Sequence, residues 1–142
     1  MSVAMIINLR TTKNKNGTPI INFPKITFDR RFNYKVGITH INYKIDATKE
    51  SLEDNELVCI VSNLVDLAAN NTHQTIGHFA YNGRKPIQNV KPAIVQYQPL
   101  QLFELEHASF EIRRLFKNDT IQIENLFLQI EILRLDAYGR IQ

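Results

Sequence analysis

Apolar residues in this chain come in short runs separated by polar segments rich in Asn, Gly and Pro. In the central run, residues 57–61 (LVCIV), apolar side chains occupy both faces of the pleat. A strand with one solvent-exposed face would alternate apolar and polar residues, so this run predicts a strand that is covered on both faces. It is either the central strand of a β-sandwich or a strand whose outer face meets another subunit. A second strand-like run follows at residues 75–81, beyond a polar loop at residues 70–72.

The remaining apolar runs also predict short strands. In residues 34–45 the apolar set moves from even to odd positions, which requires a bulge or sharp bend near Thr39 and His40. Pro24 cannot donate to a ladder, so the region around it is expected to be an edge or a bend. Besides these, strands are expected at residues 3–9, 20–23, 26–28, 92–100, 103–112, 120–124 and 126–135.

Helix is expected in one place only. Residues 46–55 (DATKESLEDN) are short and polar, and we expect one or two helical turns there at most. Residues 103–112 fit either strand alternation or one helical face, and the surrounding short strands favour strand. About eight to ten short strands without a sequence repeat predict an all-β protein, a single jelly-roll β-sandwich, with residues 1–142 forming one domain.

Composition fits this class and sets limits on partners. The hydrophobic fraction of 44% and the charged fraction of 22% are too apolar for a disordered chain. There are 17 basic and 14 acidic residues, and the basic pairs lie far apart in sequence. We interpret them as solvated loop charges, and no specific nucleic-acid site is expected.

Cysteine content and the N-terminal residues indicate the setting. One cysteine excludes an internal disulfide, and Cys59, inside the apolar run, is expected to be a small buried hydrophobe. The first ten residues do not resemble a signal peptide, and no apolar run approaches the roughly 20 residues that cross a bilayer. We expect an intracellular protein, or a particle assembled inside a cell, without membrane contact.

Candidate chemistry is sparse. A cupin-type metal site would bring a close His-x-His pair, yet no two of His40, His73, His78 and His107 stand two apart. Two pairs of carboxylates are candidates, Glu104 with Glu106 and Glu124 with Glu131. Glu104 and Glu106 would share one face of a strand and could flank a groove, as the two acids of a glycosidase do. A solvent-exposed strand face explains this first pair as well.

Aromatic residues interleave with basic ones, as on sugar-binding or single-strand-binding β-surfaces, although core or subunit-interface packing explains them as well. These are Tyr34, Tyr43, Phe79, Tyr81 and Tyr97. No Gly-x-Ser-x-Gly nucleophile motif is present. We therefore expect no enzyme activity, no cofactor and no catalytic, cofactor-binding or metal-binding residues.

Several segments, in order, resemble the penton-like minor capsid proteins of Polinton (Maverick) and adintovirus-like elements. They are residues 34–43 (YKVGITHINY), 59–65 (CIVSNLV), 74–79 (QTIGHF), 91–100 (KPAIVQYQPL) and the final strand at 126–135. The resemblance implies a single jelly-roll subunit of a viral or virus-derived particle. It would associate with itself, as a homopentamer at capsid vertices, and with a larger major capsid protein. Its location would be the virion, assembled in the nucleus or cytoplasm of the host cell.

A second interpretation remains open. A monomeric β-sandwich module of lectin-like type would use the Tyr and Phe residues with Glu104 and Glu106 to bind a ligand. The two functions differ in where apolar side chains lie. A capsid subunit leaves apolar patches on its sides, whereas a lectin keeps them inside and presents an aromatic and polar groove.

Overall fold

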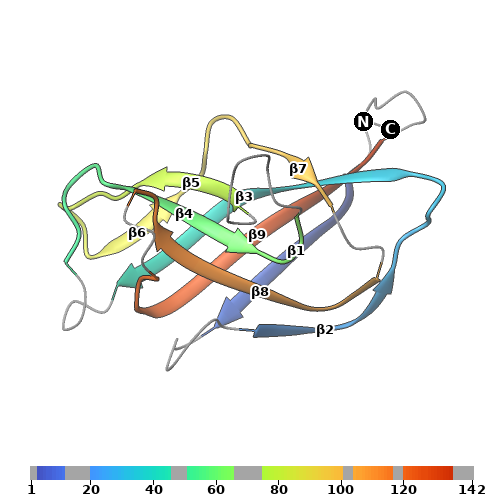
Figure 1. Ribbon diagram of the computed structural model, residues 1–142, viewed down its shortest axis with the longest axis horizontal. Helices are drawn as coiled ribbons and strands as arrows, with labels where there is room; N and C mark the ends of the chain where they lie inside the picture. Colours follow the sequence, from blue (N-terminus) through green and yellow to red (C-terminus); the bar gives the residue numbers. More distant parts are fainter. Residues whose placement is uncertain are drawn as a thin grey trace.

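The computed structural model describes residues 3–11, 20–45, 51–65, 75–100, 104–116 and 120–135. These residues form nine strands in two antiparallel sheets and no helix, so the protein is an all-β sandwich as predicted (Figure 1). The strands are β1 (Val3–Thr11), β2 (Ile20–Thr27), β3 (Asn33–Ile45), β4 (Leu57–Ser62), β5 (Thr75–Ala80), β6 (Ile87–Val90), β7 (Gln98–Pro99), β8 (Glu104–Arg114) and β9 (Ile123–Leu135).

The two sheets have different strand orders. Sheet A has the order β1-β9-β3-β6. Strand β9 pairs with one edge of β3 along most of that strand, so β6 and β7 both pair with the other edge of β3. Sheet B has the order β2-β8-β4-β5. Strand β4, which contains the doubly apolar run, therefore lies between two neighbours, as its pattern predicted.

The core lies between the sheets and is built largely from alternate residues of the long strands, such as β3, β8 and β9. Ile60 of β4, Phe110 of β8 and Ile130 of β9 are completely buried in it. In β3 the register against β9 shifts between Ile38 and His40. This bulge confirms the parity change predicted near Thr39, and it returns the later apolar residues of the strand to the core face.

Strand β2 forms one edge of sheet B, as the proline predicted. Its register against β8 shifts between Asn22 and Ile26, around Pro24. The two short pieces expected at residues 20–23 and 26–28 therefore belong to one bulged strand. The bulge lets the chain pass a residue that cannot donate a ladder hydrogen bond.

Three other segment predictions were wrong in part. Residues 92–97 are not a strand; the chain pairs with β3 at β6 and β7 and leaves the sheet between them. In the expected helix at 46–55, only residues 51–55 lie among the described residues; they are not helical, and the turn at Asp54 and Asn55 has a φ of 64° at Asn55. Residues 120–124 contribute an isolated bridge from Thr120 to Arg113 before β9 begins at Ile123.

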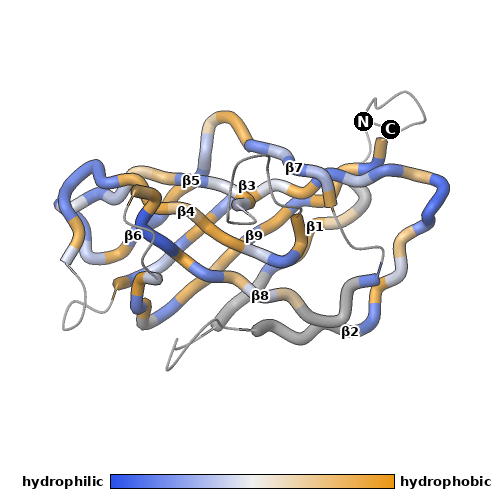
Figure 2. Tube along the Cα trace, in the orientation of Figure 1, coloured by the Kyte–Doolittle hydropathy of each residue, from blue (hydrophilic) through white to orange (hydrophobic). Residues whose placement is uncertain are grey.

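The layers leave loops at two ends of an elongated sandwich. In Figure 2 the segment between β6 and β7 projects from the upper edge with apolar colouring at its tip, whereas the turns at both ends are largely hydrophilic. Among the described residues no helix is long and apolar enough to cross a bilayer.

Candidate interaction surfaces

Each carboxylate pair considered from the sequence has one member among the described side chains, Glu104 in the first and Glu131 in the second. Glu104 is exposed, and its Oε2 lies 3.7 Å from Nζ of Lys25. Glu131 accepts a hydrogen bond from the hydroxyl of Tyr97 at 2.9 Å. The side chains of Glu106 and Glu124 lie outside the described part of the chain. The two described carboxylates therefore serve separate contacts, on different sheets.

Two of the four histidine side chains are described, and they lie on different sheets. His40 of β3 contacts Asn89 of β6, with 2.5 Å between Nε2 and Oδ1, and its ring meets Phe127 edge-on at 5.2 Å. His78 of β5 is exposed and lies opposite Cys59 of β4. Among the described residues no three His, Cys, Asp or Glu side chains gather as metal ligands would.

The aromatic residues considered for a binding platform do not share one surface. Tyr34, Tyr43 and Tyr81 are buried in the core, and Phe79 packs against it. Tyr97 is half-buried and bonds Glu131 of sheet A. Burial raises the pKa of Tyr43 above the ordinary value for tyrosine, with a smaller contribution from Tyr81. Most of these aromatic residues therefore pack in or against the core, which was the alternative explanation offered by the sequence.

Cys59 lies on the outer side of β4 and is only 2% exposed. Its cross-strand neighbours are His78 and Arg113, and Glu111 lies nearby on β8. Desolvation raises the pKa of the Cys59 thiol, and Arg113 opposes this in part. The buried thiol was predicted from the sequence.

One end of the sandwich carries a tightly bonded loop cluster formed by residues 53–56 and 81–88. The backbone N–H of Gly83 donates to Oδ1 of Asp54 at 2.8 Å. The amide of Gln88, 2% exposed, accepts from the backbone N–H of Asn82 and donates to the carbonyl oxygens of Asn82 and Lys85, all within 2.9 Å. These contacts order a surface hollow of about 410 Å³. No pattern in the sequence predicts that Gln88 is buried.

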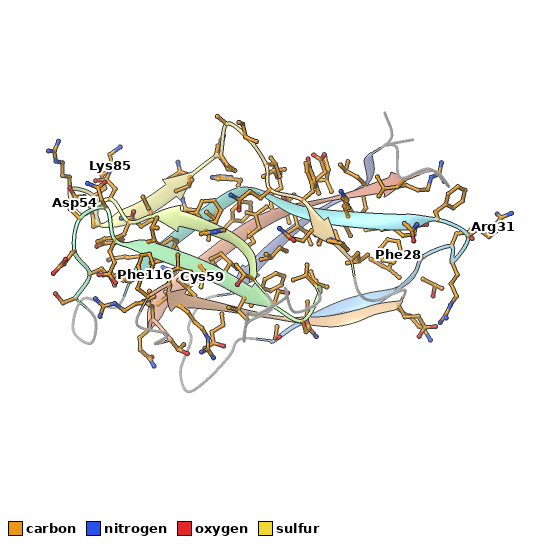
Figure 3. The ribbon with its side chains drawn as sticks, turned by 45° about the horizontal axis from the view of Figure 1, so that its top comes forward. Phe28, Arg31, Asp54, Cys59, Lys85 and Phe116 are labelled. Carbon is orange, nitrogen blue, oxygen red and sulfur yellow. The ribbon has the colours of Figure 1, made fainter. Side chains whose placement is uncertain are left out.

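An ion pair ties this end of sheet B together. The Arg114 guanidinium donates to both carboxylate oxygens of Glu56, at 2.5 and 2.7 Å. The two side chains are about 15% exposed. Two parallel hydrogen bonds between planar groups fix both orientation and distance. Phe116, two residues further on, is 83% exposed at the same end, as the stick view shows (Figure 3).

The segment between β6 and β7, residues 91–97, projects from the edge of sheet A. A Cβ built on Gly37 of β3 would lie 2.6 Å from Cγ1 of Val95 and 2.9 Å from Cδ1 of Tyr97. The hydroxyl of Tyr97 reaches Glu131, the residue that pairs with Gly37 on the next strand. A glycine inside a strand pattern is the sequence signal for such a close approach. The second half of the segment is therefore held against sheet A, through Val95 and Tyr97.

The tip of this projecting segment is apolar. Ile94 is 84% exposed at the tip. Beneath it lies a pocket of about 60 Å³, lined by residues from the segment, from β3 and from β5. The lining includes Ile38, Ile76, Phe79, Pro92 and Ile94. Such a pocket holds a few atoms of a side chain at most.

A row of polar side chains crosses the outer face of sheet A. Gln129 of β9 donates to Oδ1 of Asn8 on β1 at 3.0 Å, and its Oε1 accepts from Thr39 of β3 at 2.9 Å. The contact between His40 and Asn89 continues the row to β6. Side chains from four strands thus form a continuous polar band.

Comparison with known proteins adds no assignment: no protein-family model matches the chain, and no curated protein sequence matches it.

Proposed function

We propose that this protein is a single jelly-roll subunit of penton type, which associates with itself as a pentamer in a viral or virus-derived particle. Its other partner would be a larger major capsid protein, and its location the virion, assembled in the host nucleus or cytoplasm. The proposal gives the chain a structural role and no enzymatic one. The observation that carries it is the nested pairing of the strands.

Each pair of strands lies inside the previous pair along the sequence. Strand β1 pairs with β9, β2 with β8, β3 with β6 and β7, and β4 with β5. Successive pairs alternate between sheet A and sheet B. A long antiparallel hairpin rolled onto itself would give this arrangement, which supports a jelly roll, a fold that occurs in viral capsid proteins.

Exposed apolar side chains support self-association through two different surfaces. Ile6 of the edge strand β1 is 56% exposed. At the opposite edge of sheet A, Ile87 of β6 is 50% exposed and Ile94 projects from the segment beyond it. A closed ring uses heterologous contacts, in which each subunit offers two unlike surfaces to its neighbours. Opposite edges that both carry apolar side chains meet this requirement.

The test is the mass in solution, by size-exclusion chromatography with light scattering over a range of protein concentrations. We expect a closed ring of about five subunits, and we expect Ile6→Asn and Ile94→Asn each to give monomers. Phe116→Asn is the control, because it removes an apolar side chain as exposed as Ile94 that lies on neither edge of sheet A.

Mixing the two edge variants makes the test sharper. In a heterologous ring, Ile6→Asn leaves the Ile94 edge intact, and Ile94→Asn leaves the Ile6 edge intact. The mixture can form one intact interface and should stop at dimers, whereas each variant alone should stay monomeric. A wild-type protein that is strictly monomeric at high concentration would contradict the proposal, as would a mixture that stays monomeric while wild type forms rings.

A monomeric lectin-like module is the second candidate, and the polar band on sheet A favours it. Asn8, Thr39 and Gln129 present amide and hydroxyl groups on one face, with Phe127 at its border. A few well-placed polar groups beside an aromatic ring suit a polar ligand such as a glycan. A strict monomer that binds on a glycan array and loses binding in Gln129→Ala would support this candidate over the capsid subunit.

A further inference from the structure

Residues 82–85 form an exposed turn in the loop cluster, and the first two of them are an Asn-Gly pair. The backbone N–H of Lys85 donates to the carbonyl oxygen of Asn82 at 3.2 Å. The backbone N–H of Arg84 donates to the side-chain Oδ1 of Asn82 at 3.0 Å. The Asn82 side chain is therefore folded over the chain that follows it, as asparagine often is in turns.

An asparagine that precedes glycine can lose its side-chain amide, and asparagine is one of the thermolabile residues of proteins. The backbone nitrogen of the glycine gives up its proton and bonds to the side-chain carbon Cγ. The bond from Cγ to Nδ2 then breaks, and ammonia leaves after taking up that proton through water. Water opens the resulting succinimide ring and yields aspartate or isoaspartate. Glycine favours the reaction because it has no Cβ to hinder the approach of its nitrogen.

The turn already meets several requirements of this reaction. Asn82 and Gly83 are exposed, so water reaches both residues. The N–H of Arg84 that donates to Oδ1 of Asn82 would stabilise the negative charge that gathers on this oxygen during attack on Cγ. The remaining requirement is a Gly83 nitrogen that can lose its proton.

Asp54 holds this proton in place. The backbone N–H of Gly83 donates to Oδ1 of Asp54 at 2.8 Å. A Cβ built on Gly83 would lie 3.1 Å from Cβ of Asp54, so the two residues pack directly against each other. A hydrogen bond to a carboxylate stabilises the N–H, and the neighbouring negative charge disfavours an anionic nitrogen. The carboxylate does not remove the proton itself, because an amide nitrogen is a far weaker acid than a carboxyl group.

We propose that Asn82 is a deamidation site that Asp54 keeps unreactive while the loop cluster is folded. Deamidation to isoaspartate would add a methylene group to the main chain at position 82. The backbone N–H and carbonyl oxygen of Asn82 both bond the buried amide of Gln88, at 2.8 and 2.9 Å. A longer main chain would break these bonds, so the contact with Asp54 preserves the loop cluster against irreversible chemical change. The inference holds whatever the oligomeric state of the protein.

The experiment follows deamidation of the full chain at mildly alkaline pH, by peptide mapping with mass spectrometry. Asp54→Ala should raise the rate at Asn82 about tenfold, which corresponds to the loss of one hydrogen bond to a charged group. Asp54→Asn keeps an oxygen acceptor without the charge and should give a smaller rise. Glu53→Ala is the matched control, because it removes an exposed carboxylate one residue away and should leave the rate unchanged. Asn16 also precedes a glycine, and its rate should be the same in every variant.

Gln88→Leu separates this role of Asp54 from a general loosening of the turn. It removes hydrogen bonds at Asn82 but leaves the contact between Asp54 and Gly83. We expect faster hydrogen exchange at the Asn82 amide in this variant, with little change in the deamidation rate. Asp54→Ala should do the reverse.

Each outcome decides the proposal. A wild-type rate at Asn82 that is slow, and that rises in Asp54→Ala but not in Glu53→Ala, supports it. A wild-type rate as fast as that of the urea-unfolded chain would overturn it, because the fold would then give no protection. Equal rates in wild type and Asp54→Ala would also overturn it, because the protection would come from another group. Thermal melts check folding, and if Asp54→Ala does not fold, Asp54→Asn against Glu53→Gln makes the same comparison.

Discussion

Tyr97 packs against Gly37 so closely that a Cβ at position 37 would lie 2.9 Å from the Tyr97 ring. The same Cβ would lie 3.0 Å from the backbone oxygen of Gln96, so the projecting segment itself would have to move. Residues 91–97 can therefore follow their observed path only because β3 has no side chain at position 37.

Gly37→Ala should destabilise the protein by about 1–3 kcal/mol, the usual cost of overpacking. The measurement is the free energy of unfolding from urea titration. Gly77→Ala is the control, because its nearest contact, Phe79, would lie at an ordinary 3.5 Å. If both variants lost the same stability, the close approach at Gly37 would not be the cause.

Arg114→Met should cost more stability than the loss of any exposed ion pair. It would leave the Glu56 carboxylate, 16% exposed, without its two guanidinium hydrogen bonds. Breaking a buried pair costs about 3–5 kcal/mol, and we expect a value near the lower end. Lys25→Met is the control, because its pair with Glu104 is more than half exposed and worth about 0–1 kcal/mol. Urea titrations in which the two variants match would contradict this ranking.

Gln88→Leu should loosen the loop cluster. It would remove the three hydrogen bonds that the Gln88 amide makes with the backbone of Asn82 and Lys85. Unsatisfied backbone groups cost about 1–3 kcal/mol, and access to water at exposed Asn82 favours the lower end. Hydrogen exchange at the Asn82 amide should become much faster. Gln96→Leu, at an exposed position, should leave that exchange rate unchanged.

Stability should fall at alkaline pH, with a contribution from Tyr97. Desolvation and the hydrogen bond to Glu131 raise the pKa of Tyr97 from 10.0 to about 12. The folded state thus holds the phenolic proton more tightly than the unfolded state, so this contribution is complete below pH 10 and is lost between pH 10 and 12. The urea midpoint of Tyr97→Phe should decline less steeply over that range. An unchanged decline would show that Tyr43, whose pKa is also raised, dominates it.

Patterns within single strands could be read from the sequence, because alternation reports burial locally. The bulge near Thr39, the edge position of the strand with Pro24 and the central position of β4 in its sheet all follow from the order of apolar residues. The described structure confirms each of them. Residues 92–97 were misread because their apolar side chains pack against Gly37 and form an exposed tip outside the sheet, although their composition is that of a strand.

Contacts between distant residues were decided only by the tertiary structure. Arg30 and Arg134 are separated by most of the chain, and the pairing of β3 with β9 brings them to one end. The pairing of β4 with β8 brings Glu56 to Arg114, and hydrogen bonds to the chain at Asn82 and Lys85 accompany the burial of Gln88. The sequence by itself determined the all-β class and the core face of long strands such as β3 and β9, because alternation reports burial along a single strand. Surface sites required the fold, because charged and polar side chains carry no periodic signal and gather only where strand pairing places them.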